Sequence, residues 1–214
     1  MVPKWLYASD YEIPRKRKRV FFVGHRDSHE EFKHPETAEG KNDYGTCEEA
    51  IGDLPSLQTD EGDIIYGEEI QDYLYPIQND YQKRMRANSE KVRNHIGSIP
   101  IEKTKFMISL VPEGKNYKAL PEEYQGIYKY HEALTRYHSK KPSNTINTGH
   151  RSHFHYKWNR IPTVRESARL QSFPDDFIFY GNKSEQYRQV GNAVPPILGQ
   201  VVADALLPYL KDGE

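Results

Sequence analysis

The alternation of apolar and polar positions along the chain predicts short strands mixed with short helices. The apolar run at residues 20–24 ends in glycine and predicts a buried strand. Residues 106–111 fit either a strand or a buried helix end, and residues 142–146 predict a second strand. From Ile197 to Tyr209, apolar residues recur at helical spacing. A helix with so continuous an apolar face must pack on a large surface.

Capping sequences predict where other helices begin. Thr163 and Glu166 form a capping box, which predicts a helix over residues 164–171. The same pattern predicts a short helix near residues 46–51, and charge spacing predicts another over residues 80–96. The remaining stretches, residues 27–80 apart from that short helix and residues 148–158, are predicted to be mostly irregular loop.

Charge is distributed unevenly along the chain. The formal net charge is −1, yet residues 1–26 carry +5, residues 27–80 carry −14, residues 81–160 carry +10 and residues 161–214 carry −2. Lys and Arg near phosphates release condensed counterions, so the basic segments favour a polyanionic partner. A solvated basic face balanced by the acidic segment explains the same charges equally well.

Bulk composition narrows the class of protein. With 214 residues, 36% hydrophobic and 29% charged, the chain is typical of a soluble globular protein. The apolar stretch at residues 190–210 is interrupted by Pro195 and Pro196, so we expect no membrane span. A single cysteine, Cys47, excludes an internal disulfide and fits a reducing compartment. We therefore expect a cytoplasmic protein.

Two motifs near the C-terminus carry the strongest functional signal. Residues 160–175 read Arg-x-x-Thr-x-Arg-Glu-x-Ala-Arg-Leu-Gln-x-Phe-Pro-Asp, and residues 191–196 read Gly-Asn-Ala-Val-Pro-Pro. The pair resembles the ninth and tenth motifs of cytosine-5 DNA methyltransferases almost residue for residue. Residues 6–21 resemble the eighth motif of that family, and Arg17 and Arg19 match its two arginines.

The resemblance implies that Arg17 and Arg19 hold the target cytosine and its neighbouring phosphates. Two positions depart from the family pattern: Glu12 replaces a glycine and Arg15 replaces a glutamine. Glu12 would strain a turn that glycine accepts, and Arg15 removes an amide acceptor. A basic run taken alone is more often a nonspecific polyanion patch, but the matched flanks favour the family role.

The other two motifs imply a cofactor contact and an internal brace. Asn192 and Ala193 match positions that contact S-adenosylmethionine in the family. The ninth-motif helix is expected to brace the recognition domain against the catalytic domain. Its internal hydrogen-bonding residues would be Arg165, Glu166, Arg169 and Gln171.

Residues 35–160 occupy the place of the family's target recognition domain. Arg136 is the first candidate for a guanine or phosphate contact, because arginine pairs bidentately with guanine. A surface charge at Arg136 and an ordinary strand residue at Thr145 remain open alternatives. No Cys or carboxylate at ligand spacing accompanies the histidines, so we expect no metal site. The candidate DNA-binding residues are Arg136, Thr145, Thr148, His150 and Arg151.

The implied fold is α/β: an incomplete Rossmann-like methyltransferase domain, of one or two strands plus a C-terminal helix, with an inserted α+β target recognition domain. We expect residues 1–34 to form the C-terminal strand region of the catalytic domain and residues 35–160 the recognition domain. Residues 161–190 would be the brace and hinge, and residues 191–214 the helix that returns to the catalytic domain.

Three elements that the reaction requires are missing from the sequence. The family carries its nucleophile in Pro-Cys, its acid in Glu-Asn-Val and its cofactor loop in Phe-x-Gly-x-Gly, and none of these occurs here. Cys47 follows Gly45-Thr46, so we expect it to be an ordinary cysteine. Without a nucleophile, the chain is not expected to methylate DNA alone.

We therefore hypothesise that the chain is the smaller subunit of a split cytosine-5 DNA methyltransferase of a restriction-modification system. Double-stranded DNA would be its substrate, and a second polypeptide would share the S-adenosylmethionine site and supply the missing motifs. The apolar face at residues 194–209, and a strand at residues 20–24 without neighbours, would be docking surfaces. The alternatives are a catalytically inactive sequence-specific DNA-binding module, a truncated-gene remnant, or a generic polyanion- or RNA-binding protein.

Overall fold

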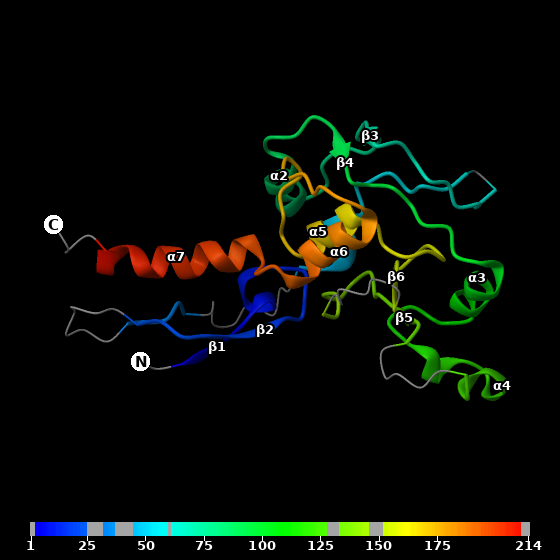
Figure 1. Cartoon of the computed structure of the whole chain (residues 1–214), viewed down its shortest axis with the longest axis horizontal. Coiled ribbons are helices and arrows are strands. Elements are labelled where there is room, and N and C mark those ends of the chain that lie inside the picture. Colours follow the sequence, from blue (N-terminus) through cyan, green and yellow to red (C-terminus); the bar gives the residue numbers. More distant parts are fainter. Residues whose placement is uncertain are drawn as a thin grey trace.

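A computed structural model describes residues 3–24, 32–36, 45–59, 61–127, 133–145 and 152–210. These residues form a mixed α/β structure with three two-stranded sheets (Figure 1). The strands are β1 (Lys4–Tyr7), β2 (Lys18–Phe21), β3 (Ile70–Gln71), β4 (Val92–Arg93), β5 (Thr135–Arg136) and β6 (His153–Phe154). The helices are η1 (Ala8–Tyr11), α1 (Cys47–Ile51), α2 (Asp80–Arg86), α3 (Glu102–Ser109), η2 (Tyr117–Ala119), α4 (Glu122–Gln125), α5 (Val164–Leu170), α6 (Lys183–Asn192) and α7 (Pro196–Leu210).

The β1–β2 hairpin lies at one end of the molecule, beside α7 (Figure 1). Leu6 points inward from β1 and packs in one core cluster with Ile197 and Leu198 of α7. Strand β2 starts earlier than predicted, at Lys18, and it pairs antiparallel with β1 through Leu6 opposite Arg19. The prediction of a strand without neighbours was therefore wrong, because β1 pairs with all four residues of β2.

Helices α1, α2, α5 and α6 make up the centre of the molecule (Figure 1). Both predicted capping boxes are present, at Thr46 with Glu49 and at Thr163 with Glu166, and each begins a helix at the predicted place. Every residue of α5 is buried. The ninth motif is therefore the central helix of the fold.

Helix α2 is shorter than predicted. It ends at Arg86 instead of continuing to residue 96, and the chain turns before forming β4. Val92 is fully buried in the central core, and Asn94 has a left-handed backbone with φ of 58°. Asparagine tolerates that conformation, which no α-helix can include. Tertiary packing of β4 thus overrides the helical charge pattern.

The far end of the molecule contains α3, α4, β5 and β6. Residues 106–109 form the end of α3, so of the two predicted alternatives the helical one is confirmed. Strand β6 lies inside the stretch predicted as loop, and it pairs in parallel with β5. Residues 142–145 form no strand, and Ser143 makes only a single bridge to Arg15. Short two-residue strands have no sequence period long enough to detect.

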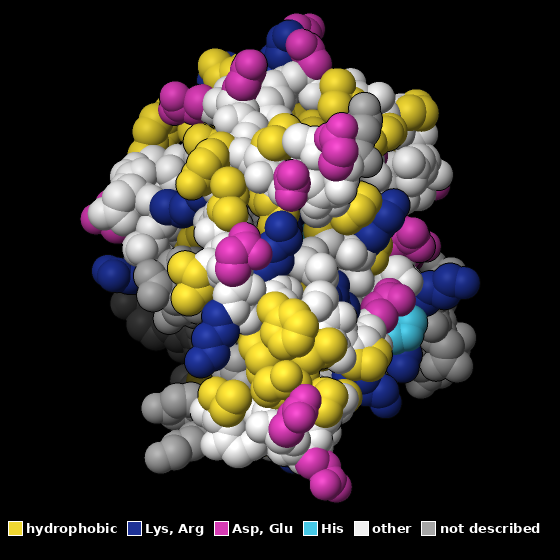
Figure 2. Space-filling model, turned by 90° about the vertical axis from the view of Figure 1, so that its right-hand side faces the viewer, with side chains coloured by type: hydrophobic (Ala, Val, Ile, Leu, Met, Phe, Trp, Pro, Cys, Tyr) yellow, Lys and Arg dark blue, Asp and Glu magenta, His cyan; other side chains and the backbone are white. Residues whose placement is uncertain are grey.

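Apolar side chains gather on this far end, where Figure 2 shows a yellow patch with both basic and acidic side chains around it. Phe106 and Tyr124 stack edge to face there, with ring centroids 6.1 Å apart. Ile101, Phe106 and Ile127 remain exposed.

Helices α6 and α7 form one run, Lys183–Leu210, that could cross a membrane on grounds of length and composition alone. The run is interrupted between Asn192 and Pro196, which leaves helices of 10 and 15 residues. Each is shorter than the roughly 20 residues that span a bilayer. Ile197 and Leu198, at the start of α7, are buried against protein.

Candidate functional site

The basic segment that leads into β2, residues 15–19, alternates between more buried and exposed side chains, as the spacing of Arg and Lys predicts. Arg15 and Arg17 are buried, Arg19 is half-buried, and Lys16 and Lys18 are exposed. An extended chain directs every second side chain to one face, so three guanidinium groups share the inner face.

Arg17 links this segment to the tenth motif. Its Nη1 donates a hydrogen bond to the carbonyl oxygen of Gly191 (3.2 Å), while its buried Nε has no hydrogen-bond partner among the residues described. Burial, and then repulsion from Arg19, lowers the pKa of Arg17 to about 10. Burial, with Arg17 next, lowers the pKa of Arg15 to about 9. An anion bound beside these three guanidinium groups would reduce the repulsion among them.

Glu12, where the family has glycine, adopts a left-handed backbone with φ of 61°. That conformation costs a residue with a side chain about 1–2 kcal/mol. The predicted strain is therefore confirmed. Gly45 lies close by, since a Cβ there would come within 2.9 Å of the carbonyl oxygen of Glu12.

The tenth motif is positioned by the ninth. Nε2 of Gln171 donates hydrogen bonds to the carbonyl oxygens of Val190 and Ala193, the latter at 2.8 Å. Asn192 is exposed at the end of α6 and lines a shallow hollow of about 320 Å³. Ala193 is half-buried beside it. The structure thus brings Arg17, Asn192 and Ala193 into one neighbourhood through Gly191 and Gln171.

Buried ion pairs hold α5 in place. Arg160 pairs with both carboxylate oxygens of Glu166 at 2.6 and 2.7 Å. Arg169 does the same with Asp175, at 2.6 and 2.7 Å, and reaches Asp53 at 3.2 Å. Bidentate geometry of this kind offsets much of the cost of burying charge.

Arg165 completes this network through backbone acceptors. It donates hydrogen bonds to the carbonyl oxygens of Arg93 (2.9 Å), Pro174 (3.1 Å) and Phe177 (2.7 Å). These contacts and those of Glu166, Arg169 and Gln171 confirm the internal role that the ninth motif predicts. Asp53 also joins this network, although it lies in a stretch that the sequence predicts to be mostly irregular loop.

Two buried histidines flank this network. His95 accepts a hydrogen bond from the Thr163 hydroxyl and donates one to the Pro55 carbonyl, both at 2.8 Å. His155 lies 3.7 Å from the Glu166 carboxylate. Burial lowers the pKa of His95 to about 4 and that of His155 to about 3, so both rings are neutral near pH 7.

Arg136 is a buried residue of β5 and not a surface charge. Its five N–H donors reach the carbonyl oxygens of Val111, His155, Trp158 and Ile108 and the Asn159 side chain, over 2.6–3.4 Å. It therefore ties α3 to the loop after β6. A DNA contact by Arg136 would require several of these bonds to break.

The other predicted DNA-binding residues divide into two groups. Thr145 is half-buried, and its hydroxyl donates a hydrogen bond to the Lys16 carbonyl (2.9 Å), which places it beside the basic segment. Thr148, His150 and Arg151 lie outside the described residues.

Cys47 is fully buried at the start of α1. Burial, with Glu113 next, raises the pKa of its thiol well above the usual range. A thiol in this state is a poor nucleophile. Among the described residues, no three His, Cys, Asp or Glu side chains cluster as a metal site would require.

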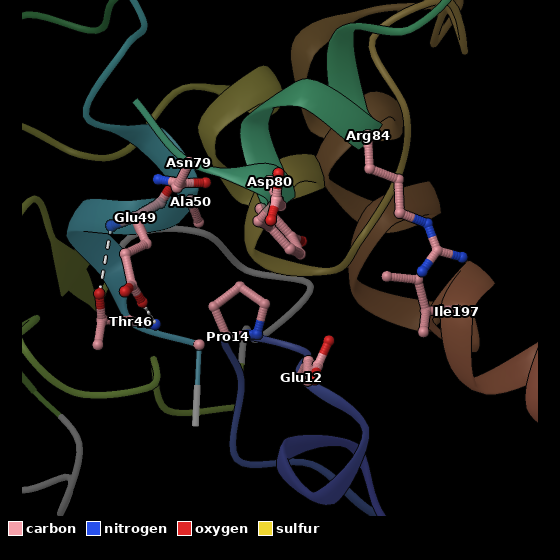
Figure 3. Close-up of a pocket in the computed structure, with 11 residues that line it drawn as sticks. Glu12, Pro14, Thr46, Glu49, Ala50, Asn79, Asp80, Arg84 and Ile197 are labelled. Carbon is pink, nitrogen blue, oxygen red and sulfur yellow. Dashed lines mark hydrogen bonds between the residues drawn. The ribbon is translucent and has the colours of Figure 1, made fainter. Parts of the chain in front are cut away.

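A cavity of about 430 Å³ lies where four segments of the chain meet (Figure 3). Carboxylates from three different segments surround it, with one arginine opposite them. The labelled residues are Glu12 and Pro14 before β2, Thr46, Glu49 and Ala50 at α1, Asn79, Asp80 and Arg84 at α2, and Ile197 at α7.

Comparison with known proteins yields consistent matches. A sequence profile for C-5 cytosine-specific DNA methylases matches residues 2–207. Type II methyltransferase M.DdeI of Desulfomicrobium norvegicum is 33% identical over 97% of this chain and 54% of its own length. Type II methyltransferase M1.HphI of Haemophilus parahaemolyticus is 38% identical over 95% of this chain and 47% of its own length. The chain thus spans about half the length of the curated relatives it matches.

A solved structure supports the fold. A prophage-encoded protein of E. coli, described as a DNA modification methyltransferase, superposes with a TM-score of 0.73 at 22% identity. The match covers 99% of this chain and 60% of that protein.

Proposed function

Because the chain belongs to the C-5 cytosine-specific DNA methylase family, we propose that it is the DNA-recognition part of a type II cytosine-5 DNA methyltransferase. Its relatives are type II methyltransferases that it matches over about half their length. The activity we propose is transfer of a methyl group to cytosine in a specific duplex sequence. This chain contributes recognition and positioning to that reaction.

The observation that carries this proposal is the joining of the eighth, ninth and tenth motifs. Arg17 bonds to Gly191, and Gln171 bonds to Val190 and Ala193, so residues far apart in the sequence form one unit. In this unit Arg17 and Arg19 are proposed to hold the flipped cytosine and its phosphates. Their crowded positive charge suits a phosphate group.

S-adenosylmethionine would supply the methyl group. The described residues fit one edge of its site, because Asn192 is exposed with a carboxamide that has no partner among them. Asn192 and Ala193 would bind that edge, and the family's cofactor loop would bind the rest. Ala193 is fixed for this role by Gln171.

We propose that a separate subunit supplies the nucleophile and the acid. The 214 residues lack Pro-Cys and Glu-Asn-Val, and Cys47 is buried and protonated. Helix α7 offers a surface for that subunit, since Leu207 and Leu210 remain 48% and 70% exposed. Exposed apolar area of this kind is typical of an interface.

The proposed function implies a domain organisation. Residues 1–34 and 191–214 would complete a Rossmann-like catalytic domain built mostly from the partner. Residues 35–160 would be the inserted recognition domain, and residues 161–190 the brace between the two. The exposed edges of the β1–β2 hairpin would continue the partner's sheet.

Co-expression tests the proposal. The chain is expressed alone and with a polypeptide carrying Pro-Cys and Glu-Asn-Val, and 5-methylcytosine is mapped by bisulfite sequencing of host DNA. We expect methylation at one short sequence only when both are present. Methylation by the chain alone, or none with both, would contradict it; DNA binding without methylation would instead support an inactive recognition module.

Arg19→Ala in the assembled enzyme should lower methylation by at least about 100-fold, the order of loss expected for a lost transition-state donor. The two chains should still co-purify, because among the described residues the Arg19 guanidinium group donates a hydrogen bond only to the Lys18 carbonyl. Lys83→Ala, at an exposed position of α2, serves as the control and should retain activity. Wild-type turnover by Arg19→Ala would refute its role.

A further inference from the structure

A second hollow, of about 450 Å³, lies between η2 and the chain after β5. Its lining is mostly polar and basic, and includes Lys115, Lys118, Asn116, Thr135 and Asn144. Neither the eighth, ninth and tenth motifs nor the ion-pair network around α5 includes these residues.

Asn144 is the most informative residue in this hollow. It lies between Ser143 and Thr145. The Ser143 N–H donates a hydrogen bond to the Pro14 carbonyl (2.9 Å), and the Ser143 carbonyl accepts one from the Lys16 N–H (2.8 Å). The Thr145 hydroxyl donates to the Lys16 carbonyl. Its backbone is therefore fixed relative to the segment that carries Arg17. Its half-buried carboxamide nevertheless has no hydrogen-bond partner among the described residues.

The opposite wall supplies positive charge. Lys115 and Lys118 are exposed, and neither ammonium group has a carboxylate partner among the described residues. The nearby Glu113 is already engaged with the Ser139 N–H and lies 3.7 Å from His138. Two lysines and a carboxamide that lack partners among the described residues match a ligand that carries both phosphates and hydrogen-bonding base edges.

We propose that this hollow is a base-reading site, with Asn144 as a specificity-determining residue and Lys115 and Lys118 as phosphate contacts. The proposal rests on the proposed function and names the residues that read the DNA in place of the internally bonded Arg136. A carboxamide offers one donor and one acceptor in a plane, which matches N6 and N7 of adenine in the major groove. Asn144 should therefore specify an A·T pair.

The first experiment uses the enzyme assembled with its catalytic part. Methylated sites are mapped by bisulfite sequencing for the wild type and for Asn144→Ala. We expect Asn144→Ala to lose about 10-fold or more of its preference at one A·T position, since a bidentate contact contributes discrimination of that order. Preference at the other positions should persist. An unchanged recognition sequence would overturn the role of Asn144.

The second experiment measures binding of the full chain to a random-sequence 30-base-pair duplex as a function of salt. The double variant Lys115→Ala/Lys118→Ala should bind more weakly at every sequence, and its salt slope should fall by about 1.8, or 0.9 for each lost phosphate contact. The matched control is Lys83→Ala/Lys103→Ala, which removes two exposed lysines outside the hollow. Equal slopes for the two double variants would overturn the phosphate contacts.

The two experiments separate this inference from the proposed function. If the wild-type assembly neither methylates nor binds DNA, both fall together. If the wild type methylates one sequence and the hollow variants behave as it does, the proposed function stands and this inference fails.

Discussion

Helices α5 and α7 belong to neighbouring motifs, yet they are buried in opposite ways. Helix α5 carries charged side chains and is wholly buried, and its Arg165, Glu166 and Arg169 are all paired inside the chain. Helix α7 is rich in apolar residues, but only Ile197 and Leu198 are buried. The polar helix is inside and the apolar helix is largely outside.

The difference concerns which helix is buried by residues of this chain. Burying an arginine is costly when its donors are left unpaired, and Arg165 and Arg169 of α5 donate to acceptors from distant parts of the chain. Beyond Leu198, every residue of α7 is half-buried or exposed, so its apolar side chains are only partly covered by the described residues. We therefore propose that α5 is the central helix of the recognition part and that α7 faces the catalytic part.

The largest expected effect is the loss of one buried charge from α5. Arg169→Ala would leave the buried carboxylates of Asp53 and Asp175 without their main partner. Removing one member of such a pair typically costs about 3–5 kcal/mol of unfolding free energy. Urea unfolding followed by tryptophan fluorescence measures this.

Arg188→Ala, at an exposed position of α6, is the control for that measurement and should change stability by less than about 0.5 kcal/mol. Equal stabilities of the two variants would show that α5 is not held by its ion pairs.

Acidification should also weaken the centre. His95 and His155 have folded pKa values of about 4 and about 3, below the roughly 6.5 of an unfolded chain. Their contribution to stability is thus fully present above pH 6.5 and is lost as the pH falls. The groups facing them are Glu166, Arg160, Arg165 and Arg136.

Each histidine should lower the unfolding free energy by up to about 1.4 kcal/mol per pH unit between pH 6 and 4. Urea unfolding at several pH values measures the slope. His138→Gln, which alters a half-buried histidine at the far end, should leave it unchanged. A flat profile over this window would contradict the burial of both rings.

A smaller effect is expected at the strained turn before the basic segment. Glu12→Gly should raise stability by about 0.5–1 kcal/mol, because glycine accepts the left-handed backbone at little cost. Asn94→Gly relieves the same backbone strain but loses the amide contacts to Phe179 at 2.8 and 3.0 Å. Thermal melting should therefore move in opposite directions for the two variants.

Local signals predicted much of this fold. The capping boxes at Thr46 and Thr163 gave the starts of α1 and α5, because a cap depends on residues three positions apart. The early end of α2 and the strand pairs depend on contacts between distant residues. No local pattern contains that information.

The candidate site was predictable to a similar degree. The alternation of Arg15, Arg17 and Arg19 predicted their shared face, since an extended chain repeats every two residues. Burial of Arg136 was not predictable, because its acceptors come from α3 and from the loop after β6. Asn144 was missed for the same reason: its free carboxamide becomes significant only beside Lys115 and Lys118.

The contrast between α5 and α7 can be measured directly by amide hydrogen exchange, in the chain alone and in its complex with the catalytic part. Backbone amides of α5 should exchange slowly in both samples, since that helix is buried within the chain. Amides of α7 beyond Leu198 should exchange quickly in the chain alone and at least about 10-fold more slowly in the complex. An α7 that exchanges equally fast in an active complex would contradict its assignment as the interface with the catalytic part.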